Sequence, residues 1–381
     1  MTSLRRSAGL LMGMFLLAGA TAASPVPERP QGSLEKIREQ CLSILEQALS
    51  SQEAFVRSGA VRAAGESEDP EVLPLLIRGT QDFFPTTRQF ALQGLRRVSP
   101  EEALIQAERA LEDTNVWVKA TALEILGELG RAGLIPRVRP LLEAPDPMVR
   151  VAAAYALFRL GESHRFETLM RALDHGDAVQ RYQVITYLGR IPDGKALARL
   201  VRLLETSQED EILVYALKAL ETRADRNHLP LLNRMLRHAN PRVRRQAAVV
   251  LGRLPAPVVT GVLAPLCVDS DPLVQVTAAM TLARLGIPRC REVFAMALQH
   301  ADYGVRSVAA RVLGDLPLPD RVALLKRALA DPNSRVRTAA VRAAGRMGGA
   351  EAFPLLWPRL TDSVEVIRAY AAGYLLKLLK P

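Results

Sequence analysis

The chain has 381 residues, of which 49% are hydrophobic and 24% charged, and its formal net charge is +10. This apolar content excludes a disordered chain and is ample for a large core. Aromatic residues make up only 5%, while alanine and leucine recur throughout. Such a composition favours closely packed helices over β-sheets and predicts an all-α fold.

The first 23 residues have the layout of a cleavable secretory signal. Arg5 and Arg6 precede an apolar stretch, and small residues follow from Ala20 onward. The stretch is too short to span a membrane comfortably, and no later segment reaches about 18 uninterrupted apolar residues. Residue 20 is alanine, where a bacterial lipoprotein signal needs cysteine. We therefore expect a periplasmic or secreted protein with no membrane span after signal removal.

One basic position recurs at a constant interval along the rest of the chain. Nine of the ten intervals are 31 residues long and one is 32. The position holds Arg57, Arg88, Lys119, Arg150, Arg181, Leu213, Arg244, Gln275, Arg306, Arg337 and Arg368. An acidic or amide residue stands four positions earlier in most copies, and alanine stands three positions later in all but one. A fixed period of this length is the signature of a repeat array.

Each copy reads as a pair of helices. In the fourth copy, Asp146 is suited to cap a helix, Pro147 suits its first turn and Gly161 its end. This predicts a helix A of about 14 residues. Apolar residues at helical spacing over 166–173 then predict a helix B. Because only a neighbouring hairpin can cover the apolar side of each hairpin, the copies must stack.

The pattern Asp-Pro-x-Val-Arg-x-x-Ala-Ala-x-x-Leu, found over 146–157, resembles the HEAT-like repeats first recognised in phycobilisome lyases. The resemblance covers Gln52 to Leu379. It implies a right-handed α-solenoid of tandem two-helix repeats, with the B helices on the inner curve. It leaves the function open, because HEAT-like arrays serve as scaffolds, as transport adaptors and as a few enzymes.

The repeat register divides the chain into four segments. They are a signal peptide at 1–23, a proline-rich leader at 24–33, an N-terminal capping helix at 34–50 and a repeat array at 51–381. The array has eleven copies, and the last supplies helix A only. We expect an arc whose first repeat is covered by the capping helix, because solenoids need atypical terminal elements.

Three cysteines cannot all pair within one chain. Cys41 falls on the apolar face of the capping helix and is expected to pack as a small hydrophobic residue. The repeat register places Cys267 and Cys290 near opposite ends of neighbouring helices, which disfavours a bond between them. We therefore expect disulfides to contribute little to this fold.

Six arginines occupy nearly equivalent points on successive B helices, beside the apolar stripe. They are Arg78, Arg109, Arg171, Arg202, Arg234 and Arg327. With the B helices on the inner curve, they would line a concave face that binds a partner. Pro265 and Met296 interrupt the row, and such variation suits selective binding. The alternative is a solvated face, whose arginine stems cover apolar surface while the charged heads stay in water.

The recurring basic position also has two interpretations. The resemblance implies that its side chain bonds to the Asp or Asn of its own or an adjacent copy and ties the starts of the A helices together. We interpret Arg57, Arg88, Lys119, Arg150, Arg181, Arg244, Arg306, Arg337 and Arg368 as this structural ladder. The alternative is a track for an anionic ligand.

Phe83, Phe84 and Trp117 depart most clearly from the repeat pattern. Phe84 stands where other copies carry the helix cap, and Trp117 falls in a first helical turn. An exposed aromatic cluster on the rim of repeats two and three would suit protein docking. Packing beneath the loop is the alternative.

The sequence lacks the motifs of common catalytic chemistry. It contains no Gly-rich phosphate loop, no G-x-S-x-G elbow, no Cys-x-x-Cys pair and no His-Glu dipeptide. We therefore predict no catalytic residue, no metal site and no cofactor.

These observations favour a non-enzymatic interaction scaffold or adaptor in the bacterial periplasm or cell envelope. Its partner would be a protein, and the net positive charge would suit an acidic one. The alternative is an enzyme or chaperone-like modifier with a small-ligand pocket near Met296, similar to a bilin lyase. The export signal argues against that activity and against a nucleic-acid partner, and the sequence leaves the oligomeric state open.

Overall fold

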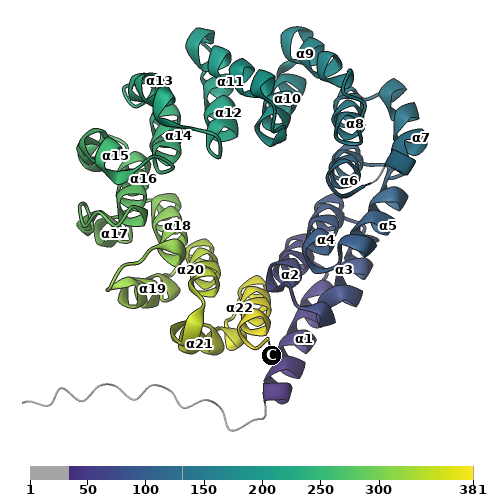
Figure 1. The fold of residues 1–381 in the computed structure, drawn as a ribbon. Helices are drawn as coiled ribbons and strands as arrows, with labels where there is room; N and C mark the ends of the chain where they lie inside the picture. The colour runs from purple at the N-terminus through teal and green to yellow at the C-terminus, as the bar shows by residue number, and fades with distance from the viewer. Residues whose placement is uncertain (1–33, 131, 381) are drawn as a thin grey trace, which may run out of the picture. The chain divides into compact units, whose positions relative to one another are not determined.

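The computed structural model describes residues 34–130 and 132–380. The chain separates into two units, Met1–Gln31 and Gly32–Pro381, and the predicted signal and leader both fall outside the described residues. Every regular element of the described part is a helix (Figure 1). The predicted all-α solenoid is confirmed. None of these helices is both long and apolar enough to cross a membrane.

The helices alternate along the chain as predicted. The A helices are α2 (Ala54–Ser67), α4 (Pro85–Val98), α6 (Val116–Leu129), α8 (Pro147–Arg159), α10 (Ala178–Arg190), α12 (Asp210–Leu220), α14 (Pro241–Leu251), α16 (Pro272–Arg284), α18 (Tyr303–Val312), α20 (Ser334–Met347) and α22 (Glu365–Leu378). The B helices are α3 (Leu73–Gly79), α5 (Pro100–Ala110), α7 (Ile135–Val138), α9 (Arg165–His175), α11 (Gly194–Thr206), α13 (Leu229–Met235), α15 (Ala256–Leu263), α17 (Glu292–Ala297), α19 (Arg321–Leu329) and α21 (Gly349–Leu356). Helix α1 (Leu34–Leu49) precedes them all.

Short 3₁₀ turns extend several of the B segments. They are η1 (Pro70–Val72), η2 (Ala132–Leu134), η3 (Arg139–Glu143), η4 (Arg226–His228), η5 (Ala264–Val268) and η7 (Trp357–Thr361). A further turn, η6 (Leu313–Asp315), extends the A helix α18 instead. Proline stands in the first turn of η1, η3, η5 and η7. The B segments are therefore more broken than the A helices, which mostly run for 10 to 14 residues.

The A helices start and end where the predicted capping residues and glycines stand. The Asp146 carboxylate accepts hydrogen bonds from two backbone N–H groups in the first turn of α8. Gly161 follows the end of that helix with a φ of +116°, a conformation that favours glycine. Helices α2, α12 and α22 begin without a side-chain cap, and so does α4, where Phe84 has no polar side chain to supply one. Instead, the carboxylate of Asp82 accepts a hydrogen bond of 2.8 Å from the Phe84 backbone N–H.

Successive A helices pack directly on one another through very small residues. A β-carbon added at Gly65 of α2 would come within 2.6 Å of the Gly94 Cα in α4. The same contact joins α6 to α8, where a β-carbon at Gly127 would lie 2.8 Å from the Ala156 Cα. The backbones therefore approach more closely than larger side chains would permit.

The last A helix packs against the first, so the array within Gly32–Pro381 has no free end (Figure 1). Helix α22 contacts α2 on the side opposite α4. Helix α1 contacts both α22 and α2, which is the place that a B helix takes between two successive A helices. The predicted capping helix therefore does not cover an exposed end. It takes the place of the second helix in the eleventh hairpin, whose helix A is the last element of the described residues.

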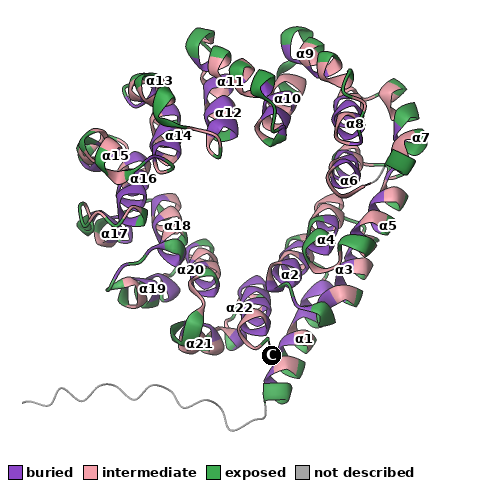
Figure 2. Cartoon of the chain, in the orientation of Figure 1, coloured by how far each residue is buried: buried purple, intermediate pink, exposed green. Residues whose placement is uncertain are grey.

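The A helices form the inner layer of this unit and the B helices the outer layer (Figure 1). Successive A helices are in contact all around the array, whereas successive B helices touch little. The expectation of B helices on the inner curve is therefore wrong. An inner layer has the shorter perimeter, so it is formed by the helices whose glycine and alanine contacts permit the closest approach. Buried residues run along most of the A helices, and exposed ones concentrate on the B helices (Figure 2).

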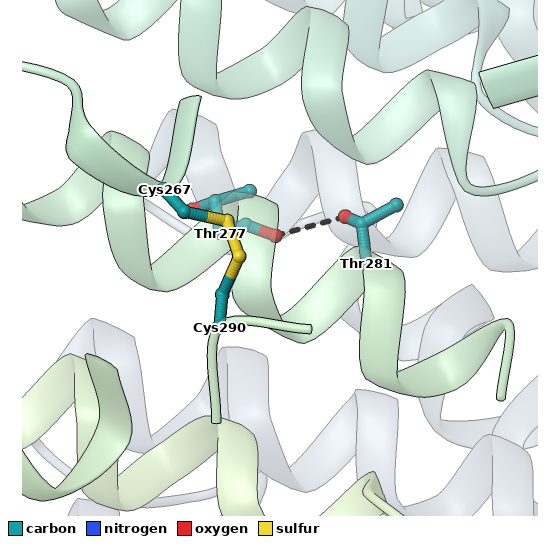
Figure 3. Close-up of a disulfide and its surroundings, with 4 residues drawn as sticks. All are labelled: Cys267, Thr277, Thr281 and Cys290. Atoms are coloured by element: carbon teal, nitrogen blue, oxygen red, sulfur yellow. Dashed lines mark hydrogen bonds between the residues drawn. A yellow bond between two sulfur atoms is a disulfide. The ribbon is translucent and has the colours of Figure 1, made fainter. Parts of the chain in front are cut away.

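Cys267 and Cys290 form a disulfide, which corrects the expectation that these residues lie too far apart (Figure 3). Their Cα atoms are 6.0 Å apart, within the usual range for a disulfide. An ideal repeat misplaces them because the B segment of this copy ends in η5, which carries Cys267. The loop after α16 then returns toward η5, with Cys290 at a φ of +64°. Cys41, the remaining cysteine, is buried and free.

Candidate functional site

The six predicted B-helix arginines are exposed and lie on the outer layer, not on the inner side where we expected them (Figure 1). Arg234 donates to the Leu204 carbonyl of α11 at 2.8 Å. Arg78 lies 3.4 Å from the Glu46 carbonyl of α1. Each guanidinium thus reaches the last turn of the preceding outer helix, where the free carbonyls favour a cation. These two arginines fasten neighbouring helices together.

The recurring basic position lies at the seams between copies. In five copies its guanidinium pairs with an aspartate 25 residues later. The pairs are Arg57–Asp82, Arg88–Asp113, Arg244–Asp269, Arg306–Asp331 and Arg337–Asp362, with N–O distances of 2.6 to 3.2 Å. This aspartate stands two residues before the helix cap of the next copy, so the partner differs from the cap residue that the resemblance implied.

The same guanidiniums also hold the chain before their own helix. Arg57 donates to the carbonyls of Ser51 and Gln52 at 3.1 and 3.0 Å. Arg150 and Arg368 make the equivalent bonds to backbone carbonyls. Arg181 pairs with Glu209 instead, at 2.8 Å, and Lys119 has no ion pair within the described residues. These contacts occupy the donors that an anionic ligand would need.

The structure separates the three predicted rim aromatics. Phe83 is 96% exposed, and Phe84 is 41% exposed at the start of α4. Trp117, which is 54% exposed, lines a pocket on the A helices together with residues of later copies. Only Trp117 therefore belongs to the candidate site.

The pocket has a volume of about 310 Å³ and is lined entirely by A-helix residues from α6, α8, α10 and α12. Its lining includes Trp117, Met148, Val179, Tyr182, Gln183 and Tyr215. Helix α8 is buried without a break from Val151 to Leu157. Side chains of α6 and α10 meet across this helix, where Tyr187 and Arg190 both contact Glu124.

Two stacked tyrosine pairs lie at the pocket, and Tyr182, Tyr215 and Tyr187 line it. The rings of Tyr182 and Tyr215 are 4.7 Å apart and nearly parallel, at 4°. Those of Tyr155 and Tyr187 are 4.0 Å apart at 9°. Each pair joins consecutive A helices, so the ring planes are held in place by the packing. The pocket thereby gains flat apolar walls from α10 and α12, with exposed Trp117 contributed by α6.

A charged network forms the edge of the pocket. The Glu124 carboxylate accepts hydrogen bonds from the Tyr187 hydroxyl at 3.0 Å and from Arg190 at 2.8 Å. Burial works to lower the pKa of Arg190, but Glu124 and then Glu128 raise it, so the guanidinium remains charged. Burial is the main cause of the raised pKa of Tyr187, which therefore stays protonated and donates.

The arrangement is suited to binding an apolar or aromatic group beside a polar edge. Within the described residues there is no cluster of His, Cys, Asp and Glu side chains that would hold a metal ion. Sequence reasoning missed Tyr182 and Tyr215. Tyr182 follows the recurring position of its copy by one residue, and Tyr215 follows that of the next copy by two. Residues at these positions could be recognised as pocket residues only once the A helices were known to form the inner layer.

Because its helical hairpins stack side by side, this chain is an α-solenoid repeat protein. The chain matches the profile of HEAT repeats over overlapping segments 106–177, 135–221, 203–283, 228–304, 260–331 and 291–376. These segments span well over half of the sequence, so the chain belongs to the HEAT-repeat family. The resemblance drawn from the repeat pattern is confirmed.

Individual relatives are more distant. The chain is 28% identical over 203 residues to the phycocyanobilin lyase subunit alpha of a Nostoc species, covering 49% of this chain and 72% of that protein. It is 28% identical over 180 residues to the same subunit of Pseudanabaena tenuis, covering 43% of this chain and 65% of that protein.

Solved structures match the chain at low sequence identity. An engineered protein is 18% identical with a TM-score of 0.31, over 89% of this chain and 98% of that one. Kap121p bound to Nup53p is 15% identical with a TM-score of 0.43, over 87% of this chain and 44% of that one.

Proposed function

We propose that the protein is an exported, non-enzymatic scaffold that binds a protein partner on the face lined by the A helices, with the aromatic pocket as the anchor point. The observation that carries this proposal is the exposed Trp117 beside the stacked Tyr182 and Tyr215. Exposed aromatic residues around a preformed pocket are the usual hot spots of protein interfaces. Repeat arrays also present the extended surface that a protein partner needs.

Two features support an extracytoplasmic location. The first 23 residues have the layout of an export signal. The Cys267–Cys290 disulfide is of a kind that persists in oxidising compartments such as the bacterial periplasm. The proposed partner is therefore a protein of the cell envelope or of the secreted fraction.

A photo-crosslinking amino acid placed at Val179 tests the proposal. This residue is 48% exposed and lines the pocket, so a bound partner should be captured there as a discrete adduct identified by mass spectrometry. The matched control carries the same amino acid at Phe55, which is 69% exposed on α2 and outside the pocket. Equal capture at both sites would contradict a pocket-centred interface.

The pocket itself favours one alternative function, the binding of a small ligand by an enzyme or chaperone-like modifier. Its volume of about 310 Å³ is at the lower end of the range for small-molecule sites. The two relatives named phycocyanobilin lyase subunit alpha give this alternative a chemical direction. Native mass spectrometry of the purified protein distinguishes the two functions. A small ligand bound at one per chain and lost in a Trp117→Ala, Tyr182→Ala variant would favour small-ligand binding over the scaffold.

A further inference from the structure

Two seams between copies contain the same recess. The first recess is lined by residues of α4, α5 and α6, and the second, two copies later, by residues of α8, α9 and α10. Five lining positions correspond in the repeat register. The corresponding pairs are Leu92 and Ala154, Gln106 and Thr168, Arg109 and Arg171, Ala110 and Ala172, and Val118 and Gln180. Each recess is therefore lined by one of the outer-layer arginines.

The two recesses differ in their acidic groups. In the first, Glu112 and Asp113 belong to the lining, and Asp113 accepts hydrogen bonds from Arg88 Nε and Nη2 at 2.7 and 2.6 Å. In the second, the place of Asp113 in the repeat register is taken by His175, the last residue of α9. Among the described residues, the lining of the second recess includes no aspartate or glutamate. It includes Arg150, the equivalent of Arg88, whose guanidinium no carboxylate covers.

Arg150 is the exception along the structural ladder. The other ladder arginines each pair with an aspartate or a glutamate. Arg150 Nη1 donates to the Ala144 and Pro145 carbonyls at 2.8 and 2.7 Å. Its Nε and Nη2, which in Arg88 hold the aspartate, make no hydrogen bond or ion pair in the part of the chain that the structure describes. Because Arg150 lines the second recess, these two donor groups remain available to a bound molecule.

Three further donor groups line the second recess. The Arg171 guanidinium has no ion pair or side-chain hydrogen bond among the described residues. Gln180 uses its Oε1 to accept a bond of 3.0 Å from the Asp177 backbone N–H, and its side-chain NH₂ group has no acceptor in the same part of the chain. The Thr168 hydroxyl has no partner there either. The second recess therefore combines two guanidiniums that lack a counter-ion with two neutral donors.

We propose that the second recess binds a small organic acid with at least two carboxylates. One carboxylate takes the place that an aspartate has at five other seams, and another binds Arg171. Guanidinium groups offer paired, planar N–H donors that match a carboxylate. The recess has a volume of about 260 Å³, just below the usual range for drug-sized ligands, so the acid is small. It shares no lining residue with the aromatic pocket, so this proposal does not rest on the proposed function.

Binding to the purified full chain is measured with two probes. Citrate, a small tricarboxylic acid, is followed by calorimetry. A fluorescein-labelled peptide of six glutamates, which carries its carboxylates on a long chain, is followed by fluorescence anisotropy. An Arg150→Gln, Arg171→Met variant should bind citrate about tenfold or more weakly, since charge-assisted hydrogen bonds are lost. Glutamine suits the first position because Gln275, its equivalent in the eighth copy, still donates to a backbone carbonyl at 2.6 Å.

The matched control is an Arg368→Gln, Arg202→Met variant, which changes the same two repeat positions in other copies and removes the same charge. Arg368 makes the same carbonyl bonds as Arg150, and Arg202 is exposed with no ion pair within the described residues. Neither lines the second recess. This control should bind citrate within about twofold of the unaltered protein, because it removes only long-range attraction.

Three results would overturn the proposal. The first is an equal loss of citrate binding in both variants, and the second is no citrate binding by the unaltered protein. The third is a loss confined to the peptide, which would assign the carboxylates to a partner chain and not to a small acid.

Thermal melting in a buffer free of carboxylic acids provides a second readout. Citrate should raise the melting temperature of the unaltered protein and of the control, because a ligand that binds the folded state stabilises it. The Arg150→Gln, Arg171→Met variant should gain little. Arg171→Met alone, which removes no ion pair or side-chain hydrogen bond of the described residues, should melt like the unaltered protein without citrate and gain less with it. An equal gain in all these proteins would mean that citrate binds elsewhere, which would also overturn the proposal.

Discussion

Tyr374 donates a hydrogen bond of 2.6 Å to Glu66, which lies 308 residues earlier in the chain. The same carboxylate accepts a bond of 2.5 Å from Arg342, so one partly buried acid joins the first, tenth and eleventh copies. Lys377 adds an ion pair to Glu68 at 2.9 Å. In an open solenoid, the end repeats lack a neighbour on one side. Here the terminal copies cover each other, and the junction becomes one more seam between copies.

Glu66→Gln should loosen this junction. The glutamine keeps the shape but leaves the Arg342 charge unpaired, so the free energy of unfolding should fall by about 1–3 kcal/mol. Hydrogen exchange should accelerate in α22 more than in α10. The control is Glu71→Gln, whose pair with Arg38 is half exposed and should matter by less than about 1 kcal/mol. Unchanged exchange in α22 would contradict a closed array.

Acid should weaken the seams between copies. Burial works to raise the pKa values of Asp82, Asp269, Asp331 and Asp362, but hydrogen bonds from the paired arginines and from backbone N–H groups lower them overall. A carboxyl whose pKa is lower in the folded state stabilises it above the unfolded pKa, near about 4, and loses that contribution as the pH falls through the folded value. The melting temperature should thus hold down to about pH 5 and fall below about pH 4.

Arg337→Met provides the control for this acid dependence. It removes the nearer of the two arginine partners of Asp362, so the variant should melt earlier at pH 7 yet lose less on acidification than the unaltered protein. Parallel melting curves across the acid range would show that this ion pair does not carry the pH dependence.

Gly65→Ala should destabilise the inner layer. The new methyl group would meet the Gly94 Cα at 2.6 Å, and overpacking of this kind costs about 1–3 kcal/mol. Gly194→Ala at the start of α11 is the matched control, because nothing lies within 4 Å of its added methyl group. A melting temperature for Gly65→Ala equal to that of the control would refute direct contact between α2 and α4.

Thiol titration should find a different number of reactive thiols in the native protein, in the unfolded protein and in the unfolded, reduced protein. The native protein should not react, because Cys41 is buried with burial raising its thiol pKa to about 12, and the other two cysteines are bonded. Unfolding without reductant should expose one thiol, and unfolding with reductant three. Cys267→Ser should lower the free energy of unfolding by about 3 kcal/mol, from the entropy of a loop spanning 23 residues. Three thiols in the unfolded, unreduced protein would rule out the bond.

The hairpins were predictable because their signals are local. Asp146 caps its helix and Gly161 ends it through contacts within a few residues, so the sequence alone specifies them. The closure was not predictable in this way. It depends on the small rotation between each pair of copies, which contacts such as Gly65 with Gly94 determine across the seams.

The candidate site was predictable only in part, for the same reason. Trp117 was recognised because it breaks the repeat pattern, but Tyr182 and Tyr215 come from separate copies and meet only in the folded inner layer. The wrong assignment of the inner helix directed attention to the B-helix arginines. The disulfide was missed because η5 and the loop before α17 depart from the ideal repeat.

The most direct test compares two variants in an affinity pull-down from the envelope fraction, after both are shown to stay folded. One carries Trp117→Ala with Tyr182→Ala in the pocket, and the other carries Arg171→Glu, Arg202→Glu and Arg234→Glu on the outer layer. We predict that a partner recovered with the unaltered protein is lost by the pocket variant and kept by the arginine variant. Loss in the arginine variant alone would contradict binding on the A-helix face.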